Sequence, residues 1–285
     1  MKIGIVGQGY VGTAVKTVFE KHYEINTFDL NGNCNCKTLH ELVNTSDIIF
    51  VCVPTPMKKD GSCEINIVET VIKDINETVK CNQDGKIVAI KSTIPPGTTN
   101  ILNKKYEHIS VIFNPEFLTE ANYIDDFKNQ NRIIIGGERP STTKLRQIYS
   151  LVFPNVKIIK TGSITAEMVK YFTNTFLSTK VSFANEMKEI CDRLNIDYDK
   201  VVEYSTYDER LGKSHWAVPG PDGKLGFGGS CFPKDLNALI HLAGELELCT
   251  EVLMGAWNTN LKVRPEEDWK QLIGRAVTRR NDAKS

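Results

Sequence analysis

The sequence contains no apolar run of about 18 residues, and its 35 basic residues are balanced by 35 acidic residues. The first absence argues against a membrane-spanning helix. The second removes any overall field that would attract nucleic acid or an anionic membrane. The N-terminus also lacks a basic region followed by an apolar core and a small-residue cleavage site. We therefore expect a cytoplasmic protein without a nucleic-acid or membrane partner.

The cysteines do not show the spacing of a metal site. The chain has 8 cysteines, and Cys34-x-Cys36, its only close pair, does not have the CxxC spacing of a zinc ligand set. A chain of 285 residues with 41% hydrophobic residues can build its core without disulfides. We expect mostly free thiols and no metal.

The N-terminal segment KIGIVGQGYVGTAV has the pattern of a dinucleotide-binding loop between a strand and a helix. Gly7 permits the tight turn, Gly9 lets the backbone approach a pyrophosphate, and Gly12 allows close helix packing. A second strand, EINTFDL, ends in Asp29, where a carboxylate can bind an adenosine ribose. Asp29 would repel a 2′-phosphate, so the sequence predicts NAD rather than NADP. The predicted cofactor contacts in this region are Gly7, Gly9, Tyr10, Val11, Gly12 and Asp29.

The order of apolar runs predicts an α/β domain followed by a helical one. Runs suited to buried parallel strands recur up to Thr161, separated by helical or loop segments: KIGIV, DIIFVCV, GKIVAIK, HISVIF, RIIIGG and NVKIIKT. We predict a Rossmann-like, doubly wound parallel sheet over residues 1–162 and an all-α domain over 163–272. A tail over 273–285 completes the chain, and its last part, RRNDAKS, is expected to be frayed.

The segment GFGGSCFPKD places one cysteine, Cys231, where a reactive thiol belongs. Pro233 suits the first turn of a helix, so Cys231 is expected just before the positive end of the helix dipole, with Lys234 adding a second positive charge. The glycines leave room for a substrate carbon to approach. Asp235, in the same first turn, can accept a proton through water, and its alternative role is helix capping. The alternative for Cys231 is an inert cysteine in a tight turn.

The stretch from Ile164 to Leu194 contains no glycine or proline and predicts one helix of about 30 residues. Lys170 and Asn174, four positions apart on it, share a face and can direct an ammonium and an amide at one developing oxyanion. The alternative is a solvated lysine and a surface asparagine. We expect the apolar side chains of this helix to pack as core: Met168, Phe172 and Phe176.

Three further segments follow predicted strands, where ligands bind in doubly wound folds. They are VPTP with Pro54 and Thr55, KSTIPP with Thr93, and NPEFLTE with Glu116, Phe117, Leu118 and Glu120. The hydroxyls can contact nicotinamide, ribose or an ordered water. Either glutamate can activate a water molecule.

Taken in order, GQGYVG, VPTP, KSTIPPGT, NPEFLTE, the Lys-x-x-x-Asn helix and GFGGSCFPKD resemble the motifs of the UDP-glucose/GDP-mannose dehydrogenase family. The resemblance covers the chain from Lys2 to about Leu239. It implies oxidation of a nucleotide-sugar C6 alcohol to the carboxylate with two NAD and one water, with UDP-glucose as the first choice of substrate.

The resemblance also implies a role for each residue. Cys231 would capture the aldehyde as a thiohemiacetal and then carry the thioester, while Lys170 and Asn174 would stabilise the oxyanions. Asp235 would act in proton transfer, and Glu116 or Glu120 with Thr93 would direct the hydrolytic water. Arg210 would reach the substrate of a neighbouring subunit, which implies a homodimer. The remaining contacts implied are Pro54, Thr55, Thr93 and Lys234 for the cofactor, and Phe117, Leu118, Lys170, Asn174, Arg210, Phe227 and Gly228 for the substrate.

The sequence departs from the family in two places. Family members normally continue into a C-terminal domain that binds the UDP moiety, so the sequence is expected to be a short form, and the segment between Arg210 and Cys231 is longer than usual. Three alternatives therefore stay open. They are a 6-dehydrogenase for another sugar nucleotide, such as GDP-mannose or a UDP-N-acetyl sugar, a 3-hydroxyacid dehydrogenase of the 6-phosphogluconate type, and a non-catalytic NAD-binding module.

Overall fold

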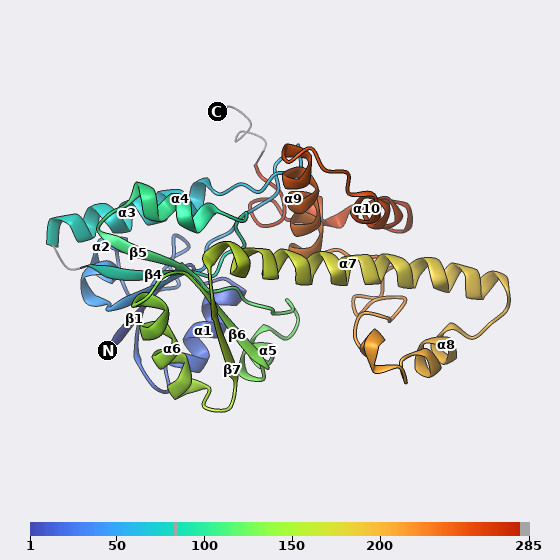
Figure 1. Cartoon of the computed structure of the whole chain (residues 1–285), viewed down its shortest axis with the longest axis horizontal. Helices are drawn as coiled ribbons and strands as arrows, with labels where there is room; N and C mark the ends of the chain where they lie inside the picture. Colours follow the sequence, from blue (N-terminus) through green and yellow to red (C-terminus); the bar gives the residue numbers. More distant parts are fainter. Residues whose placement is uncertain (83–84, 280–285) are drawn as a thin grey trace. The chain divides into compact units, whose positions relative to one another are not determined.

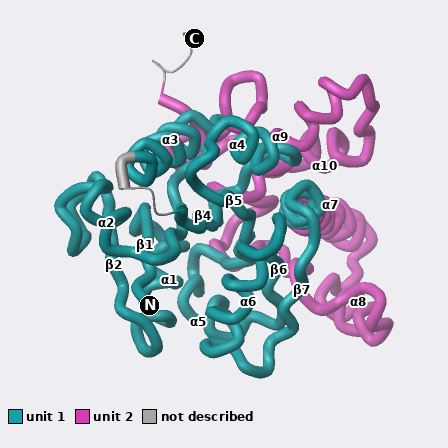
Figure 2. Tube along the Cα trace, turned by 60° about the vertical axis from the view of Figure 1, so that its left-hand side comes forward, with its two compact units in different colours: residues 1–55, 64–170 teal, residues 56–63, 171–285 magenta. Residues whose placement is uncertain are grey.

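The structure, a computed structural model, describes residues 1–82 and 85–279, without the side chains of residues 81 and 82. These residues form two compact units (Figure 2). The first contains residues 1–55 and 64–170, and the second contains residues 56–63 and the described residues from 171 onward. The domain boundaries predicted from the sequence stay predictions. The expectation of a frayed RRNDAKS tail falls almost entirely outside the described residues, of which Arg279 is the last.

A sheet of seven strands organises the first unit, in the order β2-β1-β3-β4-β5-β6-β7. All of the apolar runs proposed as strands form strands. The bounds are β1 Lys2–Val6, β2 Glu24–Phe28, β3 Ile48–Val51, β4 Lys86–Ile90, β5 Ile109–Phe113, β6 Arg132–Gly136 and β7 Lys157–Thr161.

The strands pair in parallel except at one junction. Typical registers are Ile5 with Thr27 between β1 and β2, and Val88 with Val111 between β4 and β5. Strand β6 meets β5 antiparallel through the single pair Phe113 and Gly136. The parallel, Rossmann-like architecture predicted from the sequence is therefore confirmed, with this one reversal.

Helices cover both faces of the sheet, so each face has its own core. Helices α2, α3 and α4 contribute to one cluster, which includes Leu42, Ile72 and Leu102. Helices α1, α5 and α6 contribute to the other, with Phe19 and Phe127 among its residues. The bounds are α1 Tyr10–Phe19, α2 Leu39–Thr45, α3 Asn66–Asn82, α4 Thr98–Lys105, α5 Tyr123–Lys128 and α6 Ser141–Val152.

The long helix predicted after the sheet is confirmed as α7, Ser163–Arg193, which runs without interruption for 31 residues (Figure 1). Its first turn is anchored in the first unit by Glu167, which is fully buried. The Glu167 carboxylate accepts hydrogen bonds from the backbone N–H groups of Gly97 at 2.6 Å and Thr99 at 2.8 Å. A carboxylate at this position complements the N–H groups at the start of α4, which have no acceptor within that helix.

The second unit is built from helices and loops. Its elements besides most of α7 are α8 Tyr198–Ser205, the 3-10 turn η1 Glu209–Leu211, α9 Cys231–Glu245, α10 Glu251–Val263 and the 3-10 turn η2 Asp268–Gln271. Residues 56–63 belong to this unit because the chain beyond α10 returns to them. Met57 donates its N–H to the Ala276 carbonyl at 2.8 Å and accepts from the Thr278 N–H at 3.0 Å.

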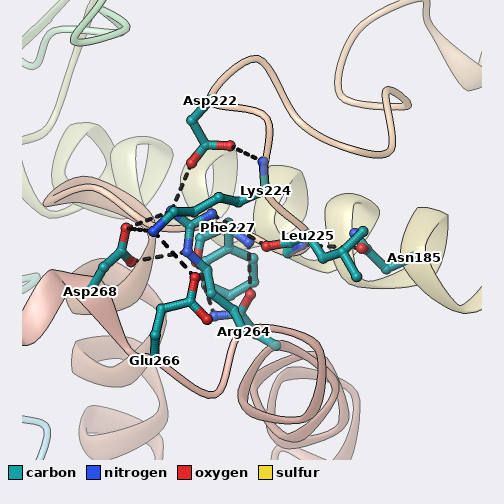
Figure 3. A network of polar contacts seen from close by, with 10 residues as sticks. Asn185, Asp222, Lys224, Leu225, Phe227, Arg264, Glu266 and Asp268 are labelled. Carbon is teal, nitrogen blue, oxygen red and sulfur yellow. Dashed lines mark hydrogen bonds and ion pairs between the residues drawn. The ribbon is translucent and has the colours of Figure 1, made fainter.

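A network of charged side chains fixes the loop that leads to α9 (Figure 3). Arg264, just beyond α10, is 2% exposed and donates to Asp222 at 2.7 Å and Asp268 at 2.6 Å. Lys224 pairs with Asp268 at 3.4 Å and with Glu266 at 3.2 Å. A buried guanidinium held by two carboxylates is strongly directional, because its donors form a planar fork. The network therefore ties the loop before Cys231, at Asp222 and Lys224, to the chain beyond α10.

Candidate active site

The glycine-rich loop in the first unit has the shape that a dinucleotide requires. Gly7 has φ +92, and a side chain there would lie 2.5 Å from the Cys52 carbonyl oxygen. A side chain at Gly12 would collide with the Gly7 carbonyl, whereas one at Gly9 would meet nothing within 4 Å. Gly7 and Gly12 are thus required by the backbone packing, and Gly9 faces open space. The residues present fit a pyrophosphate at the N-terminus of α1.

Asp29 lies directly after β2, where the sequence places it. Its carboxylate accepts hydrogen bonds from the backbone N–H groups of Gln8 and Asn31, each at 2.7 Å. The bond from Gln8 ties the end of β2 to the glycine-rich loop, and the local bond from Asn31 helps to orient the half-buried carboxylate. Tyr10 and Val11 form the first residues of α1, next to the same loop.

The loops after β3 and β4 carry the remaining hydroxyls predicted to contact the cofactor. Thr55 and Thr93 are 4% and 6% exposed, while Pro54 is exposed. Ser92 donates to the Val53 carbonyl at 2.6 Å and so ties the two loops together at the carboxyl edge of the sheet. That edge is where ligands bind in doubly wound folds.

Lys170 and Glu116 form a buried ion pair in the first unit. The Lys170 ammonium donates to Glu116 Oε1 at 2.9 Å and to the Glu116 carbonyl at 2.7 Å. The backbone N–H of Leu118 donates to Glu116 Oε2 at 2.6 Å, and the Phe117 ring centre lies 5.5 Å from the ammonium. Burial alone would raise the pKa of Glu116, but Lys170, Leu118 and the nearby Lys91 outweigh it and lower the pKa. Glu116 is therefore held ionised.

The structure joins Lys170 to the first of the two candidate glutamates. Glu120 lies four residues further along the same loop and is half-buried.

Sequence reasoning gave no role to Lys91, which is 2% exposed and donates to the Asn114 side chain at 3.1 Å. Burial lowers the pKa of Lys91 to about 8, partly offset by Cys52 and Glu116. The only signal in the sequence was a lysine at the end of an apolar strand.

In the second unit, Cys231 is the first residue of α9 rather than a residue before it. Ser230 occupies the N-cap position, and Pro233 lies inside the first turn. The earlier start follows from the glycines before Ser230, because Gly229 has φ +69 and turns the chain into the helix. The Cys231 side chain is half-buried, so it keeps access to solvent.

Asp235 is 1% exposed and connects α9 to α7. Its carboxylate accepts from the Asn174 amide at 2.6 Å and forms a close ion pair with Lys234. Burial lowers the pKa of Lys234, but attraction by Asp235, Cys231 and Cys63 outweighs it and raises the pKa. Lys234, predicted to contact the cofactor, is thus also the charge partner of Asp235.

The residues predicted to bind substrate occupy three different settings. Phe227 is buried, and both of its backbone polar groups are bonded to the Asn260 side chain, at 2.7 and 3.0 Å. Gly228 lies against the Arg264 guanidinium, which leaves no space for a side chain. The Arg210 side chain is 87% exposed, and its guanidinium donates to the carboxylate of Asp208, two residues earlier.

The expectation that the apolar residues of the long helix pack as core is wrong. Met168, Phe172 and Phe176 are 39%, 68% and 59% exposed. They recur every four residues and so form a stripe along α7, which Ile164, 50% exposed, extends at its start. Periodicity alone cannot distinguish a stripe that faces a core from one that faces outward.

The polar groups predicted to carry the chemistry fall into two sets. One contains Lys170 and Glu116, and the other contains Asn174, Asp235, Lys234 and Cys231. Lys170 and Asn174 lie one turn apart on the same helix. An ammonium, an amide, a buried carboxylate and a thiol at a helix N-terminus suit the stabilisation of oxyanions and covalent capture of a carbonyl carbon.

Comparison with protein families identifies both parts of the chain. Residues 25–153 match the NAD binding domain of the UDP-glucose/GDP-mannose dehydrogenase family, and residues 164–262 match its central domain. Together with the fit of the glycine-rich loop, the first match shows that the sheet-containing part binds NAD. None of the helices within residues 1–82 and 85–279 has an apolar stretch of the length that a bilayer requires.

Named relatives agree with this assignment. The UDP-glucose 6-dehydrogenase YwqF of Bacillus subtilis is 37% identical over 243 residues, which are 82% of this chain and 53% of the relative. The UDP-glucose 6-dehydrogenase of Rickettsia typhi is 36% identical over 77% of this chain and 50% of the relative. The chain thus spans about half the length of these curated relatives.

Solved structures show the same fold. A UDP-glucose dehydrogenase from Pyrobaculum islandicum superimposes with a TM-score of 0.84 at 28% identity, covering 92% of this chain and 68% of the other. A GDP-mannose dehydrogenase from Pseudomonas aeruginosa gives 0.70 at 26% identity, covering 92% and 69%. A 3-hydroxyisobutyrate dehydrogenase from Mycobacterium tuberculosis gives 0.74 at 15% identity, covering 93% and 94%, a likeness of fold alone.

Proposed function

The chain belongs to the UDP-glucose/GDP-mannose dehydrogenase family, and we propose that it oxidises the C6 alcohol of a nucleotide sugar to the carboxylate. UDP-glucose is the first candidate because the named relatives are UDP-glucose 6-dehydrogenases. One observation carries the proposal. Cys231 opens α9, and Asp235, one turn later, is buried with its carboxylate held by Asn174 and Lys234.

The first oxidation requires the C6 hydroxyl to lose a proton and C6 to lose a hydride. NAD, held at the loop of Gly7, Gly9 and Gly12, would accept one hydride in each of the two oxidations. Lys170 and Asn174 point N–H donors from the same face of α7 and stabilise the oxygen as negative charge develops on it. Asp235, with Lys170 and a water molecule, takes part in the transfer of the hydroxyl proton.

Cys231 holds the aldehyde between the two oxidations. Its thiolate adds to C6 to give a thiohemiacetal, and loss of the second hydride from C6 leaves a thioester on the sulfur. Covalent attachment prevents escape of the aldehyde while the reduced cofactor is replaced. The helix N-terminus at Cys231 favours the thiolate that this step requires.

Water then hydrolyses the thioester and releases the carboxylate and the thiol. Glu116 or Glu120, with Thr93, directs this water. Glu116 is suited to the role because its carboxylate is buried and held ionised by Lys170. The sum is one alcohol, two NAD and one water giving one carboxylate, two NADH and three protons.

We also propose that two copies of the chain associate through α7. The stripe of Met168, Phe172 and Phe176 exposes large apolar side chains along one helix, and a second copy of the same stripe would bury them. In that dimer the exposed Arg210 reaches the substrate phosphates in the neighbouring copy. The other substrate contacts come from the same copy as the Cys231 that reacts, and they are made by Phe117, Leu118, Phe227 and Gly228.

Another sugar nucleotide, such as GDP-mannose, is the alternative that the Pseudomonas structure favours. A 3-hydroxyacid dehydrogenase would have no use for Cys231, and it is supported only by a likeness of fold. A module that binds NAD without turnover would leave the buried Asn174–Asp235 pair without a function.

The test is a count of NADH formed per sugar consumed, with purified protein, limiting UDP-glucose and excess NAD. Two NADH per sugar, abolished by Cys231→Ser, is the expected result, because a serine cannot form the thioester. One NADH per substrate would favour the hydroxyacid enzyme. Absence of NADH with UDP-glucose would exclude UDP-glucose as the substrate. The same count would then be made with GDP-mannose and a UDP-N-acetyl sugar. NADH with either one would identify the substrate class, and none with both would favour a module that binds NAD without turnover.

A further inference from the structure

Lys91, directly after β4, is a buried lysine that the proposed mechanism does not use. Its ammonium donates to the Asn114 carbonyl at 3.2 Å and to Asn114 Oδ1 at 3.1 Å. Asn114, the first residue after β5, is also buried, and its amide donates to the Ile134 carbonyl on β6 at 2.7 Å. Lys91 therefore ties the end of β4 to the start of the loop that carries Glu116.

The contacts of Lys91 with Asn114 repeat those of Lys170 with Glu116, two residues further along. Each ammonium binds the backbone carbonyl and one side-chain oxygen of the same residue, at 2.7 to 3.2 Å. Pro115 lies between the two residues, and its ring fixes one backbone torsion of the connection. Two buried lysines, one after β4 and one on α7, thus hold the segment Asn114-Pro115-Glu116.

The titratable groups around Lys91 come from four parts of the first unit. Cys52 follows β3, Tyr149 belongs to α6, Glu116 follows β5, and Lys170 belongs to α7. Burial raises the pKa of Cys52 to about 12 and that of Tyr149 well above its usual value, so both are neutral at pH 7. Of these four groups, Glu116 is the one that supplies a negative charge. Burial lowers the pKa of Lys91 most, Lys170 lowers it further, and Glu116 acts in the opposite direction.

We infer that Lys91 is a positioning residue for Glu116, because its ammonium holds the Asn114-Pro115-Glu116 segment and, together with Lys170, balances the charge of the Glu116 carboxylate. The inference rests on the proposed function only for the use of Glu116 in directing water. Two buried cations near one carboxylate favour its ionised form and keep it in a fixed place before any substrate is bound.

The first test needs neither substrate nor NAD. The unfolding free energies of the Lys91 and Lys91→Met proteins are compared by urea unfolding from pH 5 to pH 10.5, in wild type and in three other backgrounds. The pH at which their difference begins to increase reports the folded pKa of Lys91. Glu116→Gln removes the attracting anion, so this onset should move down by about one pH unit. Lys170→Met removes a repelling cation, so the onset should move up by about half a unit. Glu167→Gln, at a fully buried carboxylate bonded to the start of α4, should leave the onset in place.

Shifts in opposite directions in Glu116→Gln and Lys170→Met would support the inference, since a lysine that only fills space would give neither. An onset that does not move in Glu116→Gln, or that moves as far in Glu167→Gln, would overturn it. If Lys91→Met does not fold, Lys91→Gln takes its place, because it keeps a donor near Asn114 without the charge.

The second test uses UDP-glucose and NAD. Lys91→Met should lower kcat about tenfold and leave KM for NAD unchanged, with the acyl-enzyme on Cys231 accumulating in intact-mass spectra because its hydrolysis is slowed. A kcat equal to that of wild type, with no acyl-enzyme, would refute a positioning role for Lys91. If wild type itself oxidises no sugar, the proposed function fails, and the unfolding measurements still decide whether Lys91 acts on Glu116.

Discussion

Replacement of Lys170 by methionine should destabilise the protein by removing one partner of a buried ion pair. The two side chains are 2% and 7% exposed, and the ammonium lies 2.9 Å from Glu116 Oε1. Methionine keeps most of the aliphatic chain but leaves the Glu116 carboxylate buried without its cation. A buried pair broken in this way costs about 3–5 kcal/mol of unfolding free energy. Glu116→Gln in the same variant should recover much of this loss, because a neutral amide is cheaper to bury than a carboxylate.

Urea unfolding followed by far-ultraviolet circular dichroism measures these free energies at pH 7. Lys2→Met is the matched control, since Lys2 pairs with Glu24 at 2.7 Å with side chains 48% and 61% exposed. An exposed pair contributes about 0–1 kcal/mol. Because the folded pKa of Glu116 is depressed, the contribution of the pair is present above its usual pKa and lost as pH falls through the folded value. A loss in Lys170→Met no larger than in Lys2→Met, or no recovery with Glu116→Gln, would refute the reasoning.

Two further predictions concern the other buried lysine and the exposed stripe. Burial lowers the pKa of Lys91 from 10.5 to about 8. Between these two pH values the unfolded chain binds more protons than the folded chain. The difference in unfolding free energy between wild type and Lys91→Met should therefore increase with pH across that window. The growth should reach about 3 kcal/mol in urea unfolding, whereas the same comparison with exposed Lys104→Met should stay flat. Phe172→Glu should weaken a dimer through α7 at least a hundredfold in analytical ultracentrifugation, since a phenylalanine buried in each copy contributes roughly 3–6 kcal/mol per dimer. Leu151→Glu, at a residue of α6 that is 58% exposed, should have no effect. A Phe172→Glu protein that associates like wild type would contradict the proposed interface.

The sheet was predictable from the sequence because its signals are local. Parallel strands buried on both faces appear as short apolar runs, and all of these runs form strands. The 31-residue helix was equally visible because nothing in the stretch interrupts it. The antiparallel pairing of β6 with β5 could not be predicted, since the two strands meet through only one residue pair, Phe113 and Gly136. Whether two neighbouring strands run parallel or antiparallel depends on the path of the chain that connects them. The apolar content of the strands does not specify that path.

Part of the candidate site could also be read from the sequence. The spacing of Lys170 and Asn174 is a property of the helix, so the sequence sufficed to place them on one face. The partners that hold them, Glu116 and Asp235, lie 54 and 61 residues away and depend on tertiary packing. Local patterns identify which groups can react, and tertiary contacts decide what orients them.

The two donors on α7 are each held by a buried carboxylate before any substrate is bound. Glu116 takes the Lys170 ammonium, and Asp235 takes the Asn174 amide at 2.6 Å. Four residues of α-helix separate the two Cα atoms by a rise of about 6 Å, and the carboxylates then fix the ends of the side chains. Donors fixed in this way need little reorganisation when charge develops on a substrate oxygen, which is the main source of electrostatic catalysis. The same carboxylates can accept protons, so under the proposed mechanism the two acids would both position the oxyanion donors and take part in proton transfer.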